Sequence, residues 1–148
     1  MIYWFTGQPG HGKTVLAKMF KEYLNTNYSH KKIIHIDGDD LRNIFDNKNY
    51  TKKGREQNIR RAQDIAKFMN HNGYDVIVSL VAPYRELREE FKESTEVKEI
   101  YVHTTDIRGR EMNHVKNYEP PLENFIDIDT TDIDAIGSLV ELINKVEV

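Results

Sequence analysis

Short apolar runs alternate with stretches of helical periodicity along the whole chain. Each run is rich in Ile, Val or aromatic residues, which is typical of buried strands. The runs are Ile2–Phe5, Ile33–Ile36, Asp75–Leu80, Glu99–His103 and Phe125–Ile128. Strands that alternate with helices in this way predict an α/β fold, in which helices flank both faces of a parallel five-stranded sheet.

The stretches between these runs carry apolar residues at steps of three and four, the spacing of one helix face. The first predicted helix carries Val15, Leu16, Met19, Phe20 and Tyr23. A later one carries Ile59, Ala62, Ile65, Ala66 and Met69, and Gly73 is expected to cap its C-terminus. The last is expected to be capped by Asp132, with an apolar face of Ile133, Ile136, Leu139, Val140 and Ile143. The polar stretches 46–53 and 108–123 lack such spacing and predict loops.

Composition narrows the class of protein further. The 148 residues contain no linker or repeat, so a single domain over 1–148 is expected. A net charge of -3, from 21 basic and 24 acidic residues, gives no basic field for nucleic acid. The absence of cysteine excludes disulfides and thiolate metal sites. No apolar stretch approaches a membrane span, and no charged leader precedes the first strand. These features predict a soluble cytoplasmic protein with neither nucleic acid nor membrane as partner.

The strongest chemical signal is a complete G-x-x-x-x-G-K-[ST] sequence between the first strand and the first helix. Its expected phosphate-binding residues are Gly7, Gly10, His11, Gly12, Lys13 and Thr14. Glycines let backbone N–H groups curl around a phosphate, and the helix adds its positive N-terminal end. Lys13 would neutralise the transferred phosphate and Thr14 would offer a hydroxyl to Mg²⁺. An ordinary glycine-rich turn is the alternative, but the position between strand and helix favours binding of ATP with Mg²⁺.

Carboxylates follow the second strand, in Asp37-Gly38-Asp39-Asp40-Leu41-Arg42. Ligands in open parallel sheets sit beyond the carboxyl ends of the strands, so Asp37 and Asp39 are expected beside the phosphate loop. A carboxylate there can orient a hydroxyl or hold Mg²⁺, and Arg42 could clamp an anion. Taken alone, the segment fits a glycine turn with Asp39 or Asp40 as a helix cap equally well.

Two further segments favour a functional site, one of them at the same edge of the predicted sheet. Arg55 and Asn58 lie one turn apart on one helix face. The segment Leu80-Val81-Ala82-Pro83-Tyr84-Arg85 ends the third strand and begins a helix. The chain closely resembles the adenylyl-sulfate (APS) kinases over residues 2 to about 130. The resemblance is carried by these two segments together with the phosphate loop, Asp37-Gly38-Asp39-x-x-Arg42 and Tyr118-Glu119-Pro120-Pro121.

This resemblance implies a three-layer P-loop NTPase fold. It also implies transfer of the ATP γ-phosphate to the 3′-hydroxyl of adenosine 5′-phosphosulfate, with ATP and a small nucleotide as partners. Arg42, Arg55 and Asn58 would grip the sulfate–phosphate end, and Tyr50 stands where the family has a Phe that stacks on adenine. Val81 and Pro83 would line the same pocket. The catalytic residues are expected to be Lys13, Asp37 and Asp39, with Thr14 and Asp39 on Mg²⁺, although sequence leaves the division between the two aspartates open.

Three departures from the family pattern matter. Ala82 replaces a serine once proposed to carry phosphate, which leaves direct in-line transfer. The chain starts on its first strand, without the N-terminal arm that many relatives use to dimerise, so a homodimer is possible but unsupported. The expected lid, residues 104–124, lacks the family's substrate-covering Lys and aromatic residue; Arg108, Arg110 and Lys116 could replace that charge, or could be ordinary surface charge.

The altered lid leaves the acceptor open. A sister kinase acting on another nucleotide, such as a cytidine diphosphoramidate, would use the same anion-binding residues. A nucleotide-dependent switch that has lost transfer would not need Asp37, Asp39, Arg42, Arg55 and Asn58 together. A polynucleotide kinase is disfavoured because no basic stripe with interleaved aromatic residues is visible.

Overall fold

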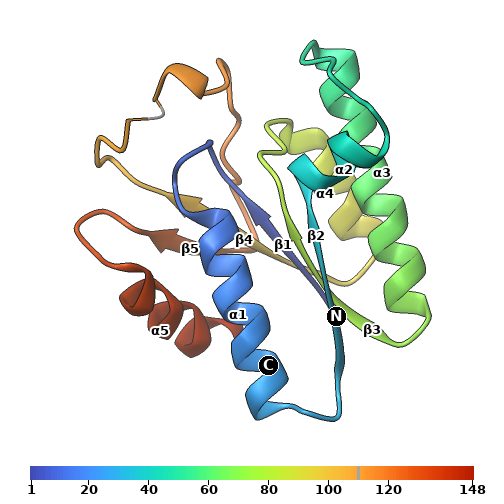
Figure 1. Ribbon diagram of the computed structural model, residues 1–148, viewed down its shortest axis with the longest axis vertical. Helices are drawn as coiled ribbons and strands as arrows, with labels where there is room; N and C mark the ends of the chain where they lie inside the picture. The colour runs from blue at the N-terminus through green and yellow to red at the C-terminus, as the bar shows by residue number, and fades with distance from the viewer. Residues whose placement is uncertain (110) are drawn as a thin grey trace.

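The computed structural model describes residues 1–109 and 111–148. Five parallel strands form one sheet in the order β2-β3-β1-β4-β5 (Figure 1). The strands are β1 (Ile2–Thr6), β2 (Lys32–Asp37), β3 (Tyr74–Ser79), β4 (Val97–His103) and β5 (Phe125–Asp129). Every strand predicted from the apolar runs is confirmed, with ends displaced by two residues at most.

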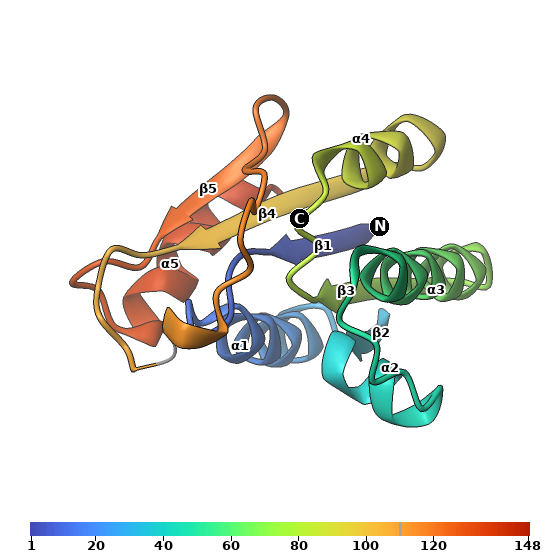
Figure 2. The same ribbon diagram turned by 90° about the horizontal axis from the view of Figure 1, so that it is seen from above.

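Helices cover both faces of this sheet and make three layers (Figure 2). The elements between the strands are α1 (Lys13–Asn27), α2 (Gly38–Ile44), α3 (Lys52–His71), α4 (Arg85–Ser94) and the 3-10 turn η1 (Glu111–Asn113), and α5 (Ala135–Val146) follows the last strand. Successive residues of β1 supply the two cores, because side chains alternate across a strand. Ile2 and Trp4 pack with α3 and α4, whereas Tyr3 and Phe5 pack with α1 and α5. The predicted α/β class is therefore confirmed.

Three expectations about the helices are wrong, one about a cap and two about buried faces. Asp134, not Asp132, caps α5, since its side chain accepts a hydrogen bond from the Gly137 N–H. Of the predicted face, Leu139 packs against the core, whereas Ile133, Ile136 and Val140 are exposed. The buried residues of α5 are Ser138, Leu142 and Val146. Seven of the twelve positions of this helix are apolar and they lie on more than one side, so the pattern could not fix which side meets the sheet. In α1, Val15 is also exposed, because it faces the cavity described below rather than the core.

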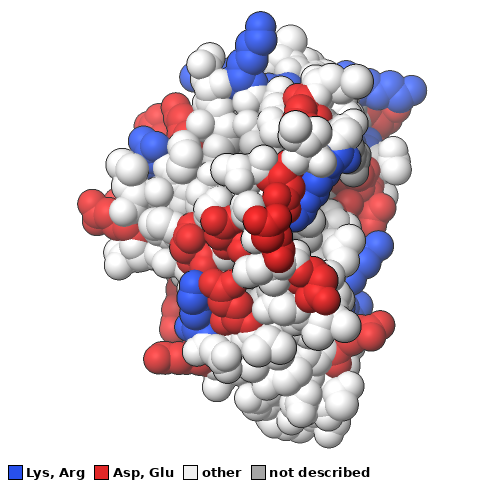
Figure 3. Space-filling model, turned by 90° about the vertical axis from the view of Figure 1, so that its left-hand side faces the viewer, with Lys and Arg blue, Asp and Glu red and all other residues white. Residues whose placement is uncertain are grey.

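The end of α3 matches its prediction. Gly73 follows the C-cap Asn72 with φ +92°, a left-handed conformation that glycine adopts without penalty. Acidic side chains gather on the side of the molecule formed by β5 and α5 (Figure 3). Asp127 and Asp129 of β5 and the α5 cap Asp134 are exposed. Among the residues that the structure describes, no helix is long and apolar enough to cross a membrane.

Candidate active site

The carboxyl ends of β1, β2 and β3 open onto a cavity of about 720 Å³. This size lies within the ~300–1,000 Å³ typical of small-molecule sites. Its wall includes the predicted residues Gly10, Gly12, Lys13, Thr14, Asp37, Asp39, Arg42, Tyr50, Arg55, Asn58, Val81 and Pro83. Segments that are distant in the sequence therefore meet at one site, because parallel strands place their carboxyl ends at one edge.

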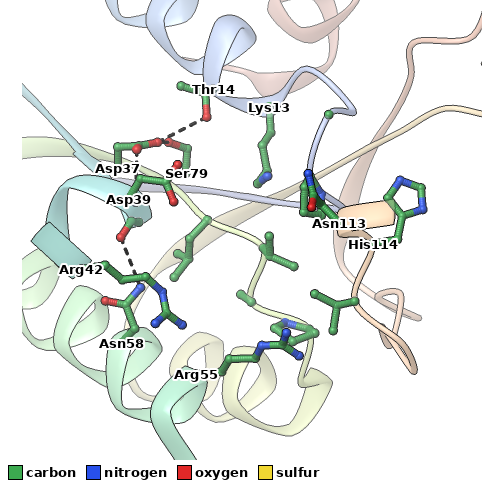
Figure 4. Close-up of a pocket in the computed structure, with 18 of the residues that line it drawn as sticks. Lys13, Thr14, Asp37, Asp39, Arg42, Arg55, Asn58, Ser79, Asn113 and His114 are labelled. Atoms are coloured by element: carbon green, nitrogen blue, oxygen red, sulfur yellow. Dashed lines mark hydrogen bonds between the residues drawn. The ribbon is translucent and has the colours of Figure 1, made fainter. Parts of the chain in front are cut away.

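The phosphate loop forms one wall. Gly7 begins it in close contact with β4: a Cβ on Gly7 would lie 2.1 Å from the Val102 carbonyl oxygen, so only glycine fits there. Gly12 adopts φ +92° at the N-cap of α1. Lys13, only 8% exposed, extends into the cavity (Figure 4), where its Nζ lies 3.5 Å from the Gln8 carbonyl oxygen. The loop thus joins backbone N–H groups, a helix N-terminus and an ammonium group, the donors that phosphates prefer.

Asp37 lies at the centre of a hydrogen-bond network across β2, β3 and α1. Its Oδ1 accepts hydrogen bonds from Thr14 Oγ1 at 3.3 Å and from Ser79 Oγ at 2.9 Å (Figure 4). Its Oδ2 accepts from the Asp39 N–H at 3.2 Å, so Asp37 also caps α2. The sequence had suggested Asp39 or Asp40 as the alternative cap; the structure gives that role to Asp37 and leaves Asp39 on the cavity wall.

Ser79 connects Asp37 to His35, which sequence analysis did not identify. Ser79 Oγ lies 2.7 Å from His35 Nε2. A hydroxyl has one proton, and Ser79 gives it to Asp37, so His35 Nε2 must carry the hydrogen that Ser79 accepts. Burial lowers the pKa of His35, partly offset by the neighbouring Asp37. The neutral imidazole of His35 therefore orients the Ser79 hydroxyl, and that hydroxyl orients the Asp37 carboxylate.

The opposite wall carries two guanidinium groups, Arg42 and Arg55 (Figure 4). Arg42 is held by the loop before α3: its Nη1 donates to the Asn49 carbonyl oxygen at 3.0 Å, and its guanidinium lies 4.1 Å from the centroid of the Tyr50 ring. Asn58 is 4% exposed, and its Nδ2 donates to the Gly38 carbonyl oxygen at 3.4 Å. This wall can bind an anion that lies across the cavity from Lys13.

Val81, Ala82 and Pro83 line the side of the cavity between these walls. Ala82 has φ +45°, a left-handed conformation that is rare for a residue with a Cβ. Two donors hold it there: Thr6 Oγ1 donates to the Val81 carbonyl oxygen at 2.7 Å, and Arg88 Nη1 donates to the Ala82 carbonyl oxygen at 2.5 Å. These hydrogen bonds thus fix the backbone of residues 81–83, which lies outside the helices and strands, where it lines the cavity.

The lid closes the remaining side. Met112, Asn113, His114 and Val115 line the cavity, a contribution that the sequence did not predict. Of the predicted lid cations, Arg108 donates from Nη2 to the Thr130 carbonyl oxygen at 2.9 Å, and Lys116 is exposed. Arg110 lies outside the described residues. The lid therefore supplies the Asn113 amide to the wall, whereas the His114 ring turns away from the cavity and packs against His11 (Figure 4).

His11 is a predicted phosphate-loop residue that contacts the lid rather than the cavity. Its ring packs edge-on against that of His114, with centroids 4.9 Å apart. Burial, followed by the nearby His114, Lys13 and Arg108, lowers the pKa of His11 to about 4. His11 is therefore neutral at physiological pH and contributes packing rather than charge.

The family model for adenylylsulphate kinase matches residues 1–121 of this chain. The chain belongs to the adenylylsulphate kinase family. Its members transfer phosphate from ATP, so the chain is an ATP-dependent kinase with the P-loop kinase fold.

Individual family relatives differ in their named acceptor. The cytidine diphosphoramidate kinase of Campylobacter jejuni is 30% identical over 133 residues, which cover 86% of this chain and 77% of that protein. An adenylyl-sulfate kinase of Picosynechococcus is 37% identical over 91 residues, covering 61% of this chain and 50% of that protein. The chain thus spans about half of the second relative's length.

Solved structures agree with the family fold. The crystal structure of APE1195 has a TM-score of 0.83 at 26% identity and covers 97% of this chain and 92% of that one. The Mycobacterium tuberculosis APS kinase CysC in complex with AMPPNP and APS has a TM-score of 0.84 at 20% identity, covering 99% and 97% of the two chains. At that identity the second likeness supports the fold alone.

Proposed function

We propose that this kinase transfers the ATP γ-phosphate to the 3′-hydroxyl of adenosine 5′-phosphosulfate. The observation that carries the proposal is the cavity itself, in which Lys13 and Thr14 face Arg42, Arg55 and Asn58 across one continuous space. A phosphate-binding loop on one wall and paired guanidinium groups on the other suit a donor triphosphate and an acceptor with an anionic end.

Positioning and charge neutralisation would supply most of the rate acceleration, as in phosphoryl transfer generally. The phosphate loop and Lys13 hold the transferred group. Arg42 and Arg55 bind the sulfate–phosphate end of the acceptor, and Asn58 supports the α2 backbone beside it. Tyr50 and Pro83 enclose the adenine. Effective molarities from such alignment reach ~10⁵–10⁸ M.

The two aspartates take different roles in this proposal. Thr14 and Asp37 supply hydroxyl and carboxylate oxygens 3.3 Å apart, the ligand types that suit Mg²⁺. They would hold the ion, which when bound neutralises charge on the phosphates. Asp39 lines the cavity next to them and would orient the acceptor hydroxyl and accept its proton. This differs from the sequence-based expectation, in which Asp39 was paired with Thr14.

A second candidate acceptor is a cytidine diphosphoramidate, and the extent of one match favours it. The match to the cytidine diphosphoramidate kinase covers 86% of this chain, against 61% for the adenylyl-sulfate kinase of Picosynechococcus. The anion-binding groups Arg42 and Arg55 fit either a sulfate or a phosphoramidate end.

An acceptor panel tests the proposal. Purified protein with Mg-ATP is assayed for ADP release and for acceptor phosphorylation, with APS, cytidine diphosphoramidate, AMP, CDP or no acceptor. We expect APS to saturate at micromolar concentration and to give a 3′-phosphorylated product. Saturation by the cytidine compound alone would select the second candidate, and ATP hydrolysis unaffected by any acceptor would indicate a nucleotide-dependent switch.

A further inference from the structure

A glutamine in the phosphate loop holds the lid. Gln8 Nε2 donates to the Val115 carbonyl oxygen at 2.9 Å, and the Val115 N–H donates to Gln8 Oε1 at 2.8 Å. The side-chain amide thus pairs with both backbone groups of one residue, as a neighbouring strand would. Val115 is 9% exposed, so water competes poorly for these groups and loss of their partner is costly.

This pairing fixes the part of the lid that faces the ligand. Val115 and the preceding Asn113 and His114 all line the cavity. The ring contact between His11 and His114, with centroids 4.9 Å apart, adds a second link from the phosphate loop to the same segment. Figures 1 and 2 show the lid at the N-terminal end of α1, above the phosphate loop.

We infer that Gln8 is a positioning residue for acceptor binding: its paired hydrogen bonds to Val115 seat Val115 and Asn113 against the acceptor. The identity of the acceptor in this inference rests on the proposed function. The contact between Gln8 and Val115 does not depend on it. Gln8 occupies one of the unspecified positions of the phosphate-loop sequence, so the triphosphate does not require a glutamine there.

The matched variants are Gln8→Leu and Gln63→Leu. Gln63 is 7% exposed, and its Nε2 donates to the Leu87 carbonyl oxygen at 2.9 Å, away from the lid. Both substitutions remove a side-chain amide that binds backbone, and leucine retains most of the glutamine volume. Gln8→Ala provides a second variant in case leucine disturbs the loop.

Two measurements are made on each protein: amide hydrogen exchange over 112–117, and the Michaelis constants for ATP and for the best acceptor. For Gln8→Leu we expect exchange at Val115 to accelerate about tenfold or more, from two lost hydrogen bonds. The acceptor KM should rise about tenfold while the ATP KM changes less than about threefold. Gln63→Leu should lower the melting temperature without changing exchange at Val115 or the acceptor KM.

The outcomes separate this inference from the proposed function. Unchanged exchange at Val115 in both Gln8 variants would overturn the contact, whatever the enzyme phosphorylates. Faster exchange with an unchanged acceptor KM, or equal increases in both KM values, would overturn the positioning role. Failure of the wild type to phosphorylate any acceptor would refute the proposed function, and with it the positioning role, while the exchange result would still decide the contact.

Discussion

A buried ion pair beneath the cavity is expected to stabilise the fold, and its geometry allows the loss of stability on breaking it to be estimated. Arg88 Nε lies 2.7 Å from Glu99 Oε2, and both side chains are 1% exposed. Lys92 Nζ binds the other carboxylate oxygen at 2.7 Å. Burial alone would lower the pKa of Lys92, but its hydrogen bonds to Glu99 and Glu89 outweigh this and raise its pKa. Arg88 also donates to the carbonyl oxygens of Ala82 and Glu119.

Arg88→Met should therefore be strongly destabilising. Removing Arg88 leaves the buried Glu99 with Lys92 on one oxygen only and takes the donor from the carbonyl oxygens of Ala82 and Glu119. Breaking a buried pair costs about 3–5 kcal/mol. For a chain of this length each kcal/mol lowers the melting temperature by roughly 2–4 °C, so we expect a fall of about 6–20 °C. The matched control is Arg60→Met, whose pair with Glu90 spans 3.8 Å with side chains 56% and 51% exposed. Such a surface pair contributes at most about 1 kcal/mol.

Thermal unfolding followed by circular dichroism measures Arg88→Met, Arg60→Met, Glu99→Leu and the double variant Arg88→Met/Glu99→Leu. The double variant should be more stable than Arg88→Met, because it contains no buried carboxylate without its guanidinium partner. A fall of less than about 3 °C for Arg88→Met, or strictly additive effects in the double variant, would refute this reasoning.

Three further predictions concern the site. The folded pKa of about 4 for His11 lies below the ordinary 6.5, so the unfolded chain binds the extra proton as pH falls from 6.5 to 4 and stability declines in that window. His11→Gln should flatten the dependence of melting temperature on pH there, and parallel curves would contradict the assignment. Ser79→Ala should weaken apparent Mg²⁺ affinity about tenfold by freeing Asp37, measured by Mg²⁺ titration of activity and by calorimetry; an unchanged affinity would count against it. Gly54→Ala should raise the acceptor KM, since its Cβ would lie 2.1 Å from the Asn49 carbonyl oxygen that holds Arg42. Gly73→Ala, whose Cβ meets nothing within 4 Å, should affect stability alone.

Sequence alone predicted the sheet and most of the cavity wall for identifiable reasons. The strands are nearly continuous apolar runs because both of their faces are buried, and such runs are visible without tertiary information. Lys13 and Asp37 were placed at one site by a topological rule, since residues that follow parallel strands gather at one edge, whereas Arg55 was placed there by the resemblance to the family.

What the sequence could not predict depends on contacts between distant segments. Gln8 and Val115 are 107 residues apart, and no local pattern marks a glutamine as the partner of a particular backbone group. Ser79 reads as the polar end of a strand until β2 brings Asp37 and His35 beside it. The prediction of the buried face of α5 was wrong for a different reason. Ile136 and Val140 are as apolar as Leu142, so the spacing of apolar residues did not show which side of the helix packs on the sheet.

The central claim is that this cavity transfers the ATP γ-phosphate to a nucleotide hydroxyl, with Lys13 on the transferred group. The most direct test incubates wild type and Lys13→Ala with γ-³²P-labelled ATP and APS, then locates the label in the product. We expect label on the 3′-oxygen of the acceptor with wild type, and at least a thousandfold less with Lys13→Ala, about 4 kcal/mol of lost transition-state stabilisation. A Lys13→Ala rate within about tenfold of wild type, or label released only as inorganic phosphate, would contradict the claim.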